Sequence, residues 1–525
     1  MPTPPGPSPI DALAAPGADG ECLFHPDPSR FADLAQKNRD ALSTSSLTIL
    51  DRPLAALREP WIADGPVVMV GHQPEWMHPG VWAKNVAAVA LSRALGGRAV
   101  FLVVDSDMPH GLAVAYPDES AGRLRRALAH PPPGVTRWAF EHIPAGPSAD
   151  WAGMFGAAHT IPESALEIYE TGFLIGEPEG DGRHLTFFDR WFSALRALDS
   201  AVGIESPQPV RISSVFSPGA PDGGSAAMTF AAAVILHARE FAGAYNAALQ
   251  SYRDRRGIRG TRHPIPDLEL TNNAVELPFW VVHPGHPRRR LFIRDESRGI
   301  QLHAEEKPIG SVTPAALSAD PAAALFSAMG AFGVRPRALA QTLFTRLICC
   351  DLFIHGVGGA KYDQITDELI RRYFHIESPA YACVSATLRL PLRRYGVTRD
   401  DIRAAARFPR DLRVDPQRHL DDAGNGGRVA ELVAARASAI DESRRLRSES
   451  PDDHGARRSA FNRIREANSA IRSLLDGNNP HASQSAAALV RQFEHDRIAA
   501  GREWFYALQP LFRLQSLRDT IVASF

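Results

Sequence analysis

The stretch that decides the fold is residues 66–105, PVVMVGHQPEWMHPGVWAKNVAAVALSRALGGRAVFLVVD. An apolar run, Val67–Val70, meets a polar turn, and Gly80 opens a helix-like stretch that stops at Gly96-Gly97. A second apolar run, Ala99–Val104, then ends at Asp105. Strand, loop, helix and strand in this order predict a parallel βαβ unit.

Outward from this unit, the βα pattern returns late in the chain, with a helix over 360–374 and a strand over 381–390. Between the two parts, a long helix at 227–255 and a hairpin near 279–295 indicate an α+β insertion. The predicted divisions are a disordered arm (1–20), a Rossmann-like parallel-sheet core in two parts (21–200 and 321–395), the α+β insertion (201–320) and a C-terminal helical bundle or coiled coil (396–525).

Charge and composition exclude several classes of protein. The 58 Lys+Arg against 59 Asp+Glu leave a net charge of −1, so no nucleic acid and no anionic membrane is expected as a partner without a local basic patch. The four cysteines lack the spacing of a disulfide framework or a zinc site. The N-terminus does not read as a secretory signal and no apolar run reaches a membrane span, so a cytoplasmic location is expected.

The first candidate site is the loop between the first predicted strand and helix. A helix N-terminus at the carboxyl end of a parallel strand favours a phosphate or carboxylate. The loop and the first turns of the helix supply glycines for close approach, polar donors or acceptors, and one cation: Gly71, His72, Gln73, His78, Gly80 and Lys84. The alternative is that Pro74 and Pro79 shape an ordinary loop and that the histidines cap the helix.

The second candidate is Asp105-Ser106-Asp107, which follows the next predicted strand. Because neighbouring parallel strands end at the same edge of a sheet, Asp105 and Asp107 are expected beside the first loop, to bind an amine, to hold a metal, or to act as a base. Ordinary turn and N-cap chemistry is the alternative.

Two later segments complete the set of candidates. A glycine-rich loop that begins at His355 feeds a helix and would cradle an anion through Gly358, Gly359, Lys361 and Tyr362, although it lacks the GK[ST] ending of a Walker A loop. The alternative is that this loop is an ordinary helix C-cap followed by a turn. The late strand carries two hydroxyls and a cation, Ser385, Thr387 and Arg389.

Taken in order, these segments resemble the bacillithiol-biosynthesis cysteine-adding enzymes over residues 65–395. That family has a Gly-x-Gln loop, a Gly-Pro helix start with a downstream Lys, an acidic cluster, an Arg-Pro, a Gly-Gly loop and a Ser-x-Thr-Leu strand end. The positions that match are Gly71, Gln73, Gly80, Lys84, Asp105, Asp107, Arg335-Pro336, Gly358-Gly359 and Ser385 to Leu388. The acidic cluster here lacks the family's middle His, and the Gly-Gly loop continues with Ala-Lys-Tyr instead of Pro and an acidic residue.

The resemblance implies a core similar to the nucleotidylyltransferases and class I aminoacyl-tRNA synthetases. It implies a ligase that joins an amino acid, cysteine in that family, to an amine-bearing small molecule. We expect His72, Gln73, His78, Asp105 and Asp107 to form the catalytic group. A nucleotidylyltransferase that uses ATP or ADP with Mg²⁺ is the alternative, and here His78-Pro79-Gly80 keeps the first His and the Gly of the His-x-Gly-His loop but loses its second His. A non-catalytic ligand-binding scaffold is the third hypothesis, with a homodimer formed through the C-terminal helices.

Overall fold

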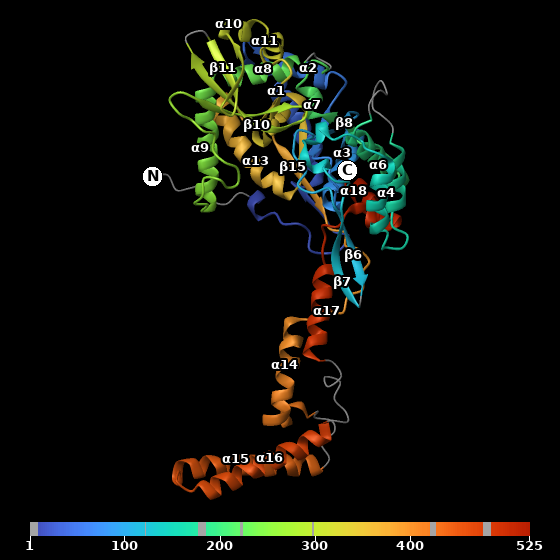
Figure 1. Ribbon diagram of the computed structural model, residues 1–525, viewed down its shortest axis with the longest axis vertical. Helices are drawn as coiled ribbons and strands as arrows, with labels where there is room; N and C mark the ends of the chain where they lie inside the picture. Colours follow the sequence, from blue (N-terminus) through green and yellow to red (C-terminus); the bar gives the residue numbers. More distant parts are fainter. Residues whose placement is uncertain are drawn as a thin grey trace. The chain divides into compact units, whose positions relative to one another are not determined.

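A computed structural model describes residues 9–120, 122–176, 185–220, 224–296, 299–420, 427–475 and 485–525 (Figure 1). The chain divides into two compact units. We call Met1–Pro117, Arg126–Pro391 and Arg502–Phe525 the core unit, and Asp118–Arg125 with Leu392–Gly501 the helical unit. The sequence predicts one helical region over 396–525, whereas the structure assigns residues 502–525 to the core unit.

The core unit is built on a six-stranded sheet with strand order β1-β15-β14-β4-β5-β8. Its strands are β1 (Cys22–His25), β4 (Val67–His72), β5 (Arg98–Val103), β8 (Gln208–Arg211), β14 (Leu352–His355) and β15 (Tyr381–Ala386). All neighbouring strands pair in parallel except β1 with β15. From β4, the chain adds β5 and β8 on one side and later β14 and β15 on the other, so the strand order reverses between β4 and β14.

The predicted βαβ unit of residues 66–105 is confirmed. Helix α3 (Pro79–Ala94) connects β4 to β5, and Gly97 allows the return because a Cβ there would lie 2.0 Å from the Pro66 carbonyl oxygen. β4 is buried from Val67 to Val70, as expected for a central parallel strand covered on both faces.

The later elements follow the prediction in part. The helix expected over 227–255 is two helices, α8 (Ser225–Leu236) and α9 (Ala238–Arg256), which meet at His237. The sequence does not predict the short strand β14, because its three apolar residues, Leu352–Ile354, continue the apolar pattern of the helix before it. Helix α13 (Val357–Leu369) begins within the predicted glycine-rich loop, so Gly358 and Gly359 lie in its first turn.

The insertion contains a five-stranded antiparallel sheet, β12-β11-β10-β9-β13. The predicted hairpin is confirmed as β9 (Val275–His283) and β10 (His286–Glu296), with β11 (Gly299–Ala304), β12 (Lys307–Val312) and β13 (Gly333–Pro336) alongside. A continuous hydrophobic core joins this sheet, α8, α9 and one face of the central sheet. Cys349 and Cys350 are buried in it.

The remaining helices of the core unit are α1 (Phe31–Ser43), α2 (Leu54–Ile62), α4 (Ser148–Ala158), α5 (Leu166–Ile175), α6 (Phe187–Val202), α7 (Ile212–Val215), α10 (Pro314–Ala319), α11 (Pro321–Met329), α12 (Ala338–Phe344) and α18 (Leu511–Val522). Two π-helical turns, η5 (Thr345–Cys349) and η6 (Ile370–Phe374), follow α12 and α13. The strand pairs β2 (Thr48–Ile49) with β3 (Arg52–Pro53) and β6 (Val114–Ser120) with β7 (Arg123–Ala129) form two small ladders.

The helical unit contains α14 (Arg399–Val414), α15 (Gly427–Glu449), α16 (His454–Leu475) and α17 (Ala486–Ala499). α15 and α16 are joined by a short turn and lie side by side (Figure 1). The predicted helical character of this region is confirmed. Among the described helices of the chain, none is both long and apolar enough to cross a bilayer.

Candidate functional site

The loop from β4 to α3 holds two histidines in opposite tautomers. His72 Nδ1 lies 2.9 Å from the Gln73 carbonyl oxygen, and since a carbonyl only accepts, His72 Nδ1 carries the proton and Nε2 is left as an acceptor. His78 caps α3, and its Nδ1 accepts from the Gly80 backbone N–H at 3.1 Å, so its Nε2 carries the proton and donates. The loop therefore presents one imidazole acceptor and one imidazole donor.

Both imidazoles are held neutral. Burial, and then the charge of Lys84, lowers the pKa of His72 to about 4. Burial, and then the charge of Arg502, lowers the pKa of His78 to about 3. Near neutral pH the two rings keep the tautomers that their hydrogen bonds select.

Lys84 stands one turn and a half into α3 and is only 4% exposed. Its Nζ donates to the Gly71 carbonyl oxygen at 3.1 Å, and within the described ranges no carboxylate forms an ion pair with it. Burial lowers its pKa to about 8. A buried ammonium group without a carboxylate partner destabilises the folded protein unless an anion binds to it.

The start of α13 faces Lys84 across the point where the strand order reverses. A Cβ on Gly356, the residue before α13, would lie 3.9 Å from Lys84 Cδ, and a Cβ on Gly359 would lie 2.9 Å from His355 Nδ1. Only glycine allows that second approach. Lys84 and Lys361 both act electrostatically on Cys383 in β15, so the two ammonium groups approach the same strand.

The lysines are notable because the chain contains only four, Lys37, Lys84, Lys307 and Lys361, beside 54 arginines. Two of the four therefore lie on the helices that follow β4 and β14, Lys84 in α3 and Lys361 in α13. A compact ammonium and a planar guanidinium differ in shape and in how readily they lose a proton, so they are not interchangeable at a buried site.

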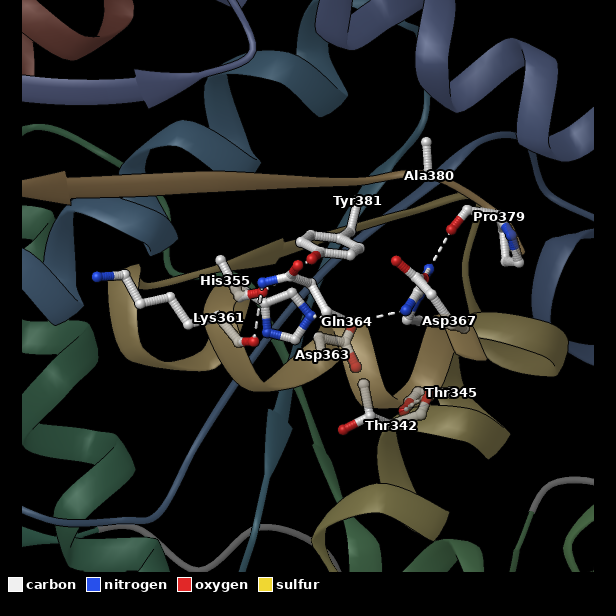
Figure 2. Close-up of polar contacts among 12 residues, drawn as sticks. Thr342, Thr345, His355, Lys361, Asp363, Gln364, Asp367, Pro379, Ala380 and Tyr381 are labelled. Carbon is white, nitrogen blue, oxygen red and sulfur yellow. Dashed lines mark hydrogen bonds and ion pairs between the residues drawn. The ribbon is translucent and has the colours of Figure 1, made fainter. Parts of the chain in front are cut away.

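A buried polar network anchors α13 (Figure 2). His355 Nε2 and Asp363 Oδ2 are 2.9 Å apart, and Arg346 donates to Asp363 at 2.6 Å and to Asp367 at 2.7 Å. The Arg346 guanidinium also stacks over the ring of Tyr381, whose hydroxyl donates to the Ala360 carbonyl oxygen. Figure 2 shows the Lys361 side chain extending away from this network, which fixes the helix and leaves the ammonium outside.

Arg502 joins the site from the segment that follows the helical unit in sequence, and sequence reasoning missed it. Its Nη2 lies 3.3 Å from Ser385 Oγ and 3.4 Å from the Ala386 carbonyl oxygen. A Cβ on Gly80 would come within 2.6 Å of the same Nη2, so the glycine at the start of α3 makes room for the guanidinium. No local motif marks Arg502, because only the fold returns this segment to the sheet.

Thr387 and Arg389 contact the N-terminal segment. Thr387 Oγ1 donates to the Pro16 carbonyl oxygen at 2.7 Å, and the Arg389 backbone N–H donates to Asp19 Oδ1 at 2.7 Å. The structure describes residues 9–20 of the predicted disordered arm, and residues 16–20 lie against the end of β15. Residues 1–8 lie outside the described residues. Tyr362 is exposed and its ring lies 6.5 Å from that of Tyr252 in α9.

Asp105 and Asp107 are both paired. Asp105 is fully buried and accepts from Arg211 Nε at 2.7 Å and from the Ser213 backbone N–H at 3.0 Å. Asp107 accepts from Gln73 Nε2 at 2.8 Å and forms an ion pair with Arg288. The contact with Gln73 places the ends of β4 and β5 together, as expected, but both carboxylates already serve an arginine.

The described residues contain no group of three or more His, Cys, Asp or Glu side chains placed to hold a metal ion. A cavity of about 1030 Å³ lies elsewhere, along α5, α6 and residues 204–209, and none of the predicted site residues lines it. We call Lys84, Lys361 and Arg502, together with the neutral imidazoles of His72 and His78, the cationic cluster. It offers one acceptor and several donors to an anion at the carboxyl ends of β4, β14 and β15.

Neither the protein-family models nor the curated protein sequences contain a match to this chain.

Proposed function

We propose that the chain is a ligase-like enzyme that joins an amino acid to an amine-bearing small molecule, with the cationic cluster as its site. One observation carries the proposal: Lys84, the two neutral imidazoles and Arg502 gather where the strand order reverses. In open α/β sheets this is where ligands bind. Within the described ranges neither Lys84 nor Arg502 forms an ion pair with a carboxylate, so the donors there are available to a substrate anion.

The strand order supports a Rossmann-like core as part of this proposal. Numbered along the chain, the five parallel strands β4, β5, β8, β14 and β15 lie in the order 3-2-1-4-5, which is the order of the first five strands of doubly wound dinucleotide-binding sheets. The site then lies at the switch point between the first and fourth strands.

The two imidazoles suit amide-bond formation. An attacking amine must lose a proton, and His72 Nε2 is the acceptor that would take it. The new C–N bond replaces a C–O bond of the acyl group, whose oxygen leaves as water or, where ATP has activated the carboxylate, with phosphate or AMP. Negative charge grows on the oxygens of the reacting acyl group, where His78 Nε2–H, Lys84 and Arg502 would donate. Asp107 would orient Gln73 instead of binding the amine, because Gln73 and Arg288 already occupy its oxygens.

A nucleotidylyltransferase with ATP and Mg²⁺ is the second candidate. The observation that favours it is the position of His78-Pro79-Gly80, which starts the helix directly after the first strand of the reversal. A phosphate at that helix start would meet backbone N–H groups together with Lys84 and Arg502. A non-catalytic ligand-binding scaffold, dimerised through a coiled coil of the helical unit, is the third.

The deciding experiment is a mass-spectrometric screen of the purified full chain. It is incubated with the amino acids and a panel of primary amines, with and without ATP and Mg²⁺. A ligase yields a product with the summed mass of acid and amine less one water. Pyrophosphate release with transfer of a nucleotidyl group and no condensation identifies the second candidate.

The matched variants are Lys84→Met and Lys307→Met, which remove a cluster lysine and an exposed lysine of β12. Loss of product in Lys84→Met alone supports the cationic cluster as the site. Equal activity of both variants rules the cluster out, and retention of a ligand without any product identifies a scaffold.

A further inference from the structure

Helix α14 of the helical unit carries a row of arginines on one face. Arg399, Arg403, Arg407, Arg410 and Arg413 follow one another at intervals of four, four, three and three residues, and all five are exposed. Such intervals place side chains on one face of a helix. We call these five residues the arginine row.

The opposite face anchors the helix. Ile402, Phe408 and Leu412 are half-buried, and the ring of Phe408 packs against His419 at 4.8 Å. A capping box between Thr398 and Asp401 fixes the first turn. The arginine row is therefore presented on a helix whose rotation about its axis is set by packing.

Few carboxylates balance the row. Arg403 pairs with Asp400 at 3.1 Å, and Arg399 lies 6.0 Å over the ring of Phe493. Within the described part of the chain, Arg407, Arg410 and Arg413 form no ion pair. Three neighbouring guanidinium groups thus repel one another unless anions lie between them.

The whole unit shares this imbalance. The helical unit contains 22 arginines against 18 acidic residues and no lysine, a net charge of +4, so the rest of the chain carries −5. The near-zero charge of the whole protein conceals a local basic surface, which is the condition under which a polyanionic partner becomes favourable.

We infer that the arginine row docks onto the phosphate backbone of a double-stranded nucleic acid. From Arg399 to Arg413 the row is roughly 21 Å long at 1.5 Å per residue. That length corresponds to about six phosphates of one strand at 3.4 Å each. Contacts of this kind position a protein on the duplex without reading its sequence.

A duplex fits the row better than a single strand does. Single-strand sites combine cations with aromatic rings on which bases stack. The only aromatic residue of α14, Phe408, lies on the packed face. A duplex also binds the row without the cost of ordering a flexible single strand.

The test is fluorescence anisotropy of the full chain with labelled duplexes of roughly 20 base pairs, as DNA and as RNA, and with their single strands, over a range of salt concentrations. The variants are the triple Arg403→Gln, Arg407→Gln, Arg410→Gln and a control triple Arg445→Gln, Arg458→Gln, Arg465→Gln on α15 and α16. All six arginines are exposed, and far-ultraviolet circular dichroism checks that each variant is folded.

The expected result is duplex binding whose logarithmic salt slope falls by about 3 in the first triple, since each phosphate contact contributes about 0.9. The control triple keeps the slope, and replacing the same three row residues by Lys restores it. Absence of duplex binding at about 50 mM salt overturns the inference. So does an equal loss in the control triple, or tighter binding of the single strands.

Discussion

Lys84 carries its charge into a part of the core unit where only 4% of the residue reaches solvent. Its pKa falls from 10.5 to about 8, because burial disfavours the ammonium form. A difference of this size corresponds to about 3 kcal/mol of destabilisation of the folded state at neutral pH. Lys84 thus lowers the stability of the folded state, a cost that fits the binding role proposed for it.

Replacement of Lys84 by Met is expected to stabilise the protein by about 2 kcal/mol at pH 7, since the desolvation cost disappears and one hydrogen bond of about 1 kcal/mol is lost. Between about pH 8 and pH 10.5 the unfolded lysine holds a proton that the folded one has released. The native protein should therefore gain stability relative to the variant as pH rises through this window.

Urea unfolding of both proteins at pH 7 and at about pH 10 measures the effect. Lys307→Met, at an exposed position, should leave the free energy of unfolding unchanged. A Lys84→Met protein that is less stable than the native one at pH 7 would show that Lys84 is paired more strongly than its contacts indicate.

The residues of the site differ in how well the sequence predicts them. His72, His78 and Lys84 are adjacent along the chain, so a strand and a helix start suffice to bring them together. Arg502 has no such neighbour, because it approaches Gly80 only after the chain has left and rejoined the core unit. The contacts of Thr387 and Arg389 with residues 16–19 could not be predicted from the sequence either, because this Pro- and Gly-rich segment has no hydrophobic periodicity.

At the scale of elements, α13 depends on its buried network. Arg346 is held by two carboxylates and stacks on Tyr381, while His355 shares Asp363 (Figure 2). The first turn of α13, with Gly359 and Lys361, keeps its place because these groups neutralise one another.

Asp363→Asn is expected to destabilise the core unit by about 3 kcal/mol, because it leaves a buried guanidinium with one carboxylate fewer. The double variant Asp363→Asn, Arg346→Met should recover part of this loss. Glu368→Gln, which breaks ion pairs with the half-exposed Arg371 and Arg372, is the control and should cost under about 1 kcal/mol. Equal free energies of unfolding for Asp363→Asn and Glu368→Gln would contradict the proposed role of the network.

The elements also show what periodicity can and cannot predict. The unit of residues 66–105 has a helix of sixteen residues between two apolar strands, so its pattern is unambiguous. β14 has four buried residues, and no period distinguishes them from the helix that precedes them. Without β14, the reversal of strand order, which brings the start of α13 opposite Lys84, could not be predicted from the sequence.

At the scale of the whole molecule, residues 502–525 are an integral part of the core unit. Trp504, Phe505 and Tyr506 are buried there, and Phe505 packs against Tyr169 at 4.9 Å. Helix α18 (Leu511–Val522) packs on α3 and α6. In sequence, Leu392–Gly501 of the helical unit are therefore an insertion into the core unit, whose last segment follows them.

Two deletions test this organisation. Replacement of Leu392–Gly501 by a short Gly/Ser linker should leave a folded core unit, because the core unit is compact by itself. Truncation after Gly501 removes three buried aromatic residues and should abolish the cooperative unfolding transition. Thermal unfolding and near-ultraviolet circular dichroism distinguish the outcomes, and a folded truncated protein would show that the core closes without its last segment.

The position of residues 502–525 in the sequence also delays the completion of the core unit during translation. Every strand of the central sheet has been translated by Ala386, but the segment that covers Tyr169 and brings the guanidinium to α3 follows only after the whole stretch from Leu392 to Gly501. At bacterial or eukaryotic elongation rates this delay is roughly 5 to 20 s. During that interval the nascent core exposes apolar surface and lacks Arg502, so chaperone contact with ribosome-bound chains should be concentrated there.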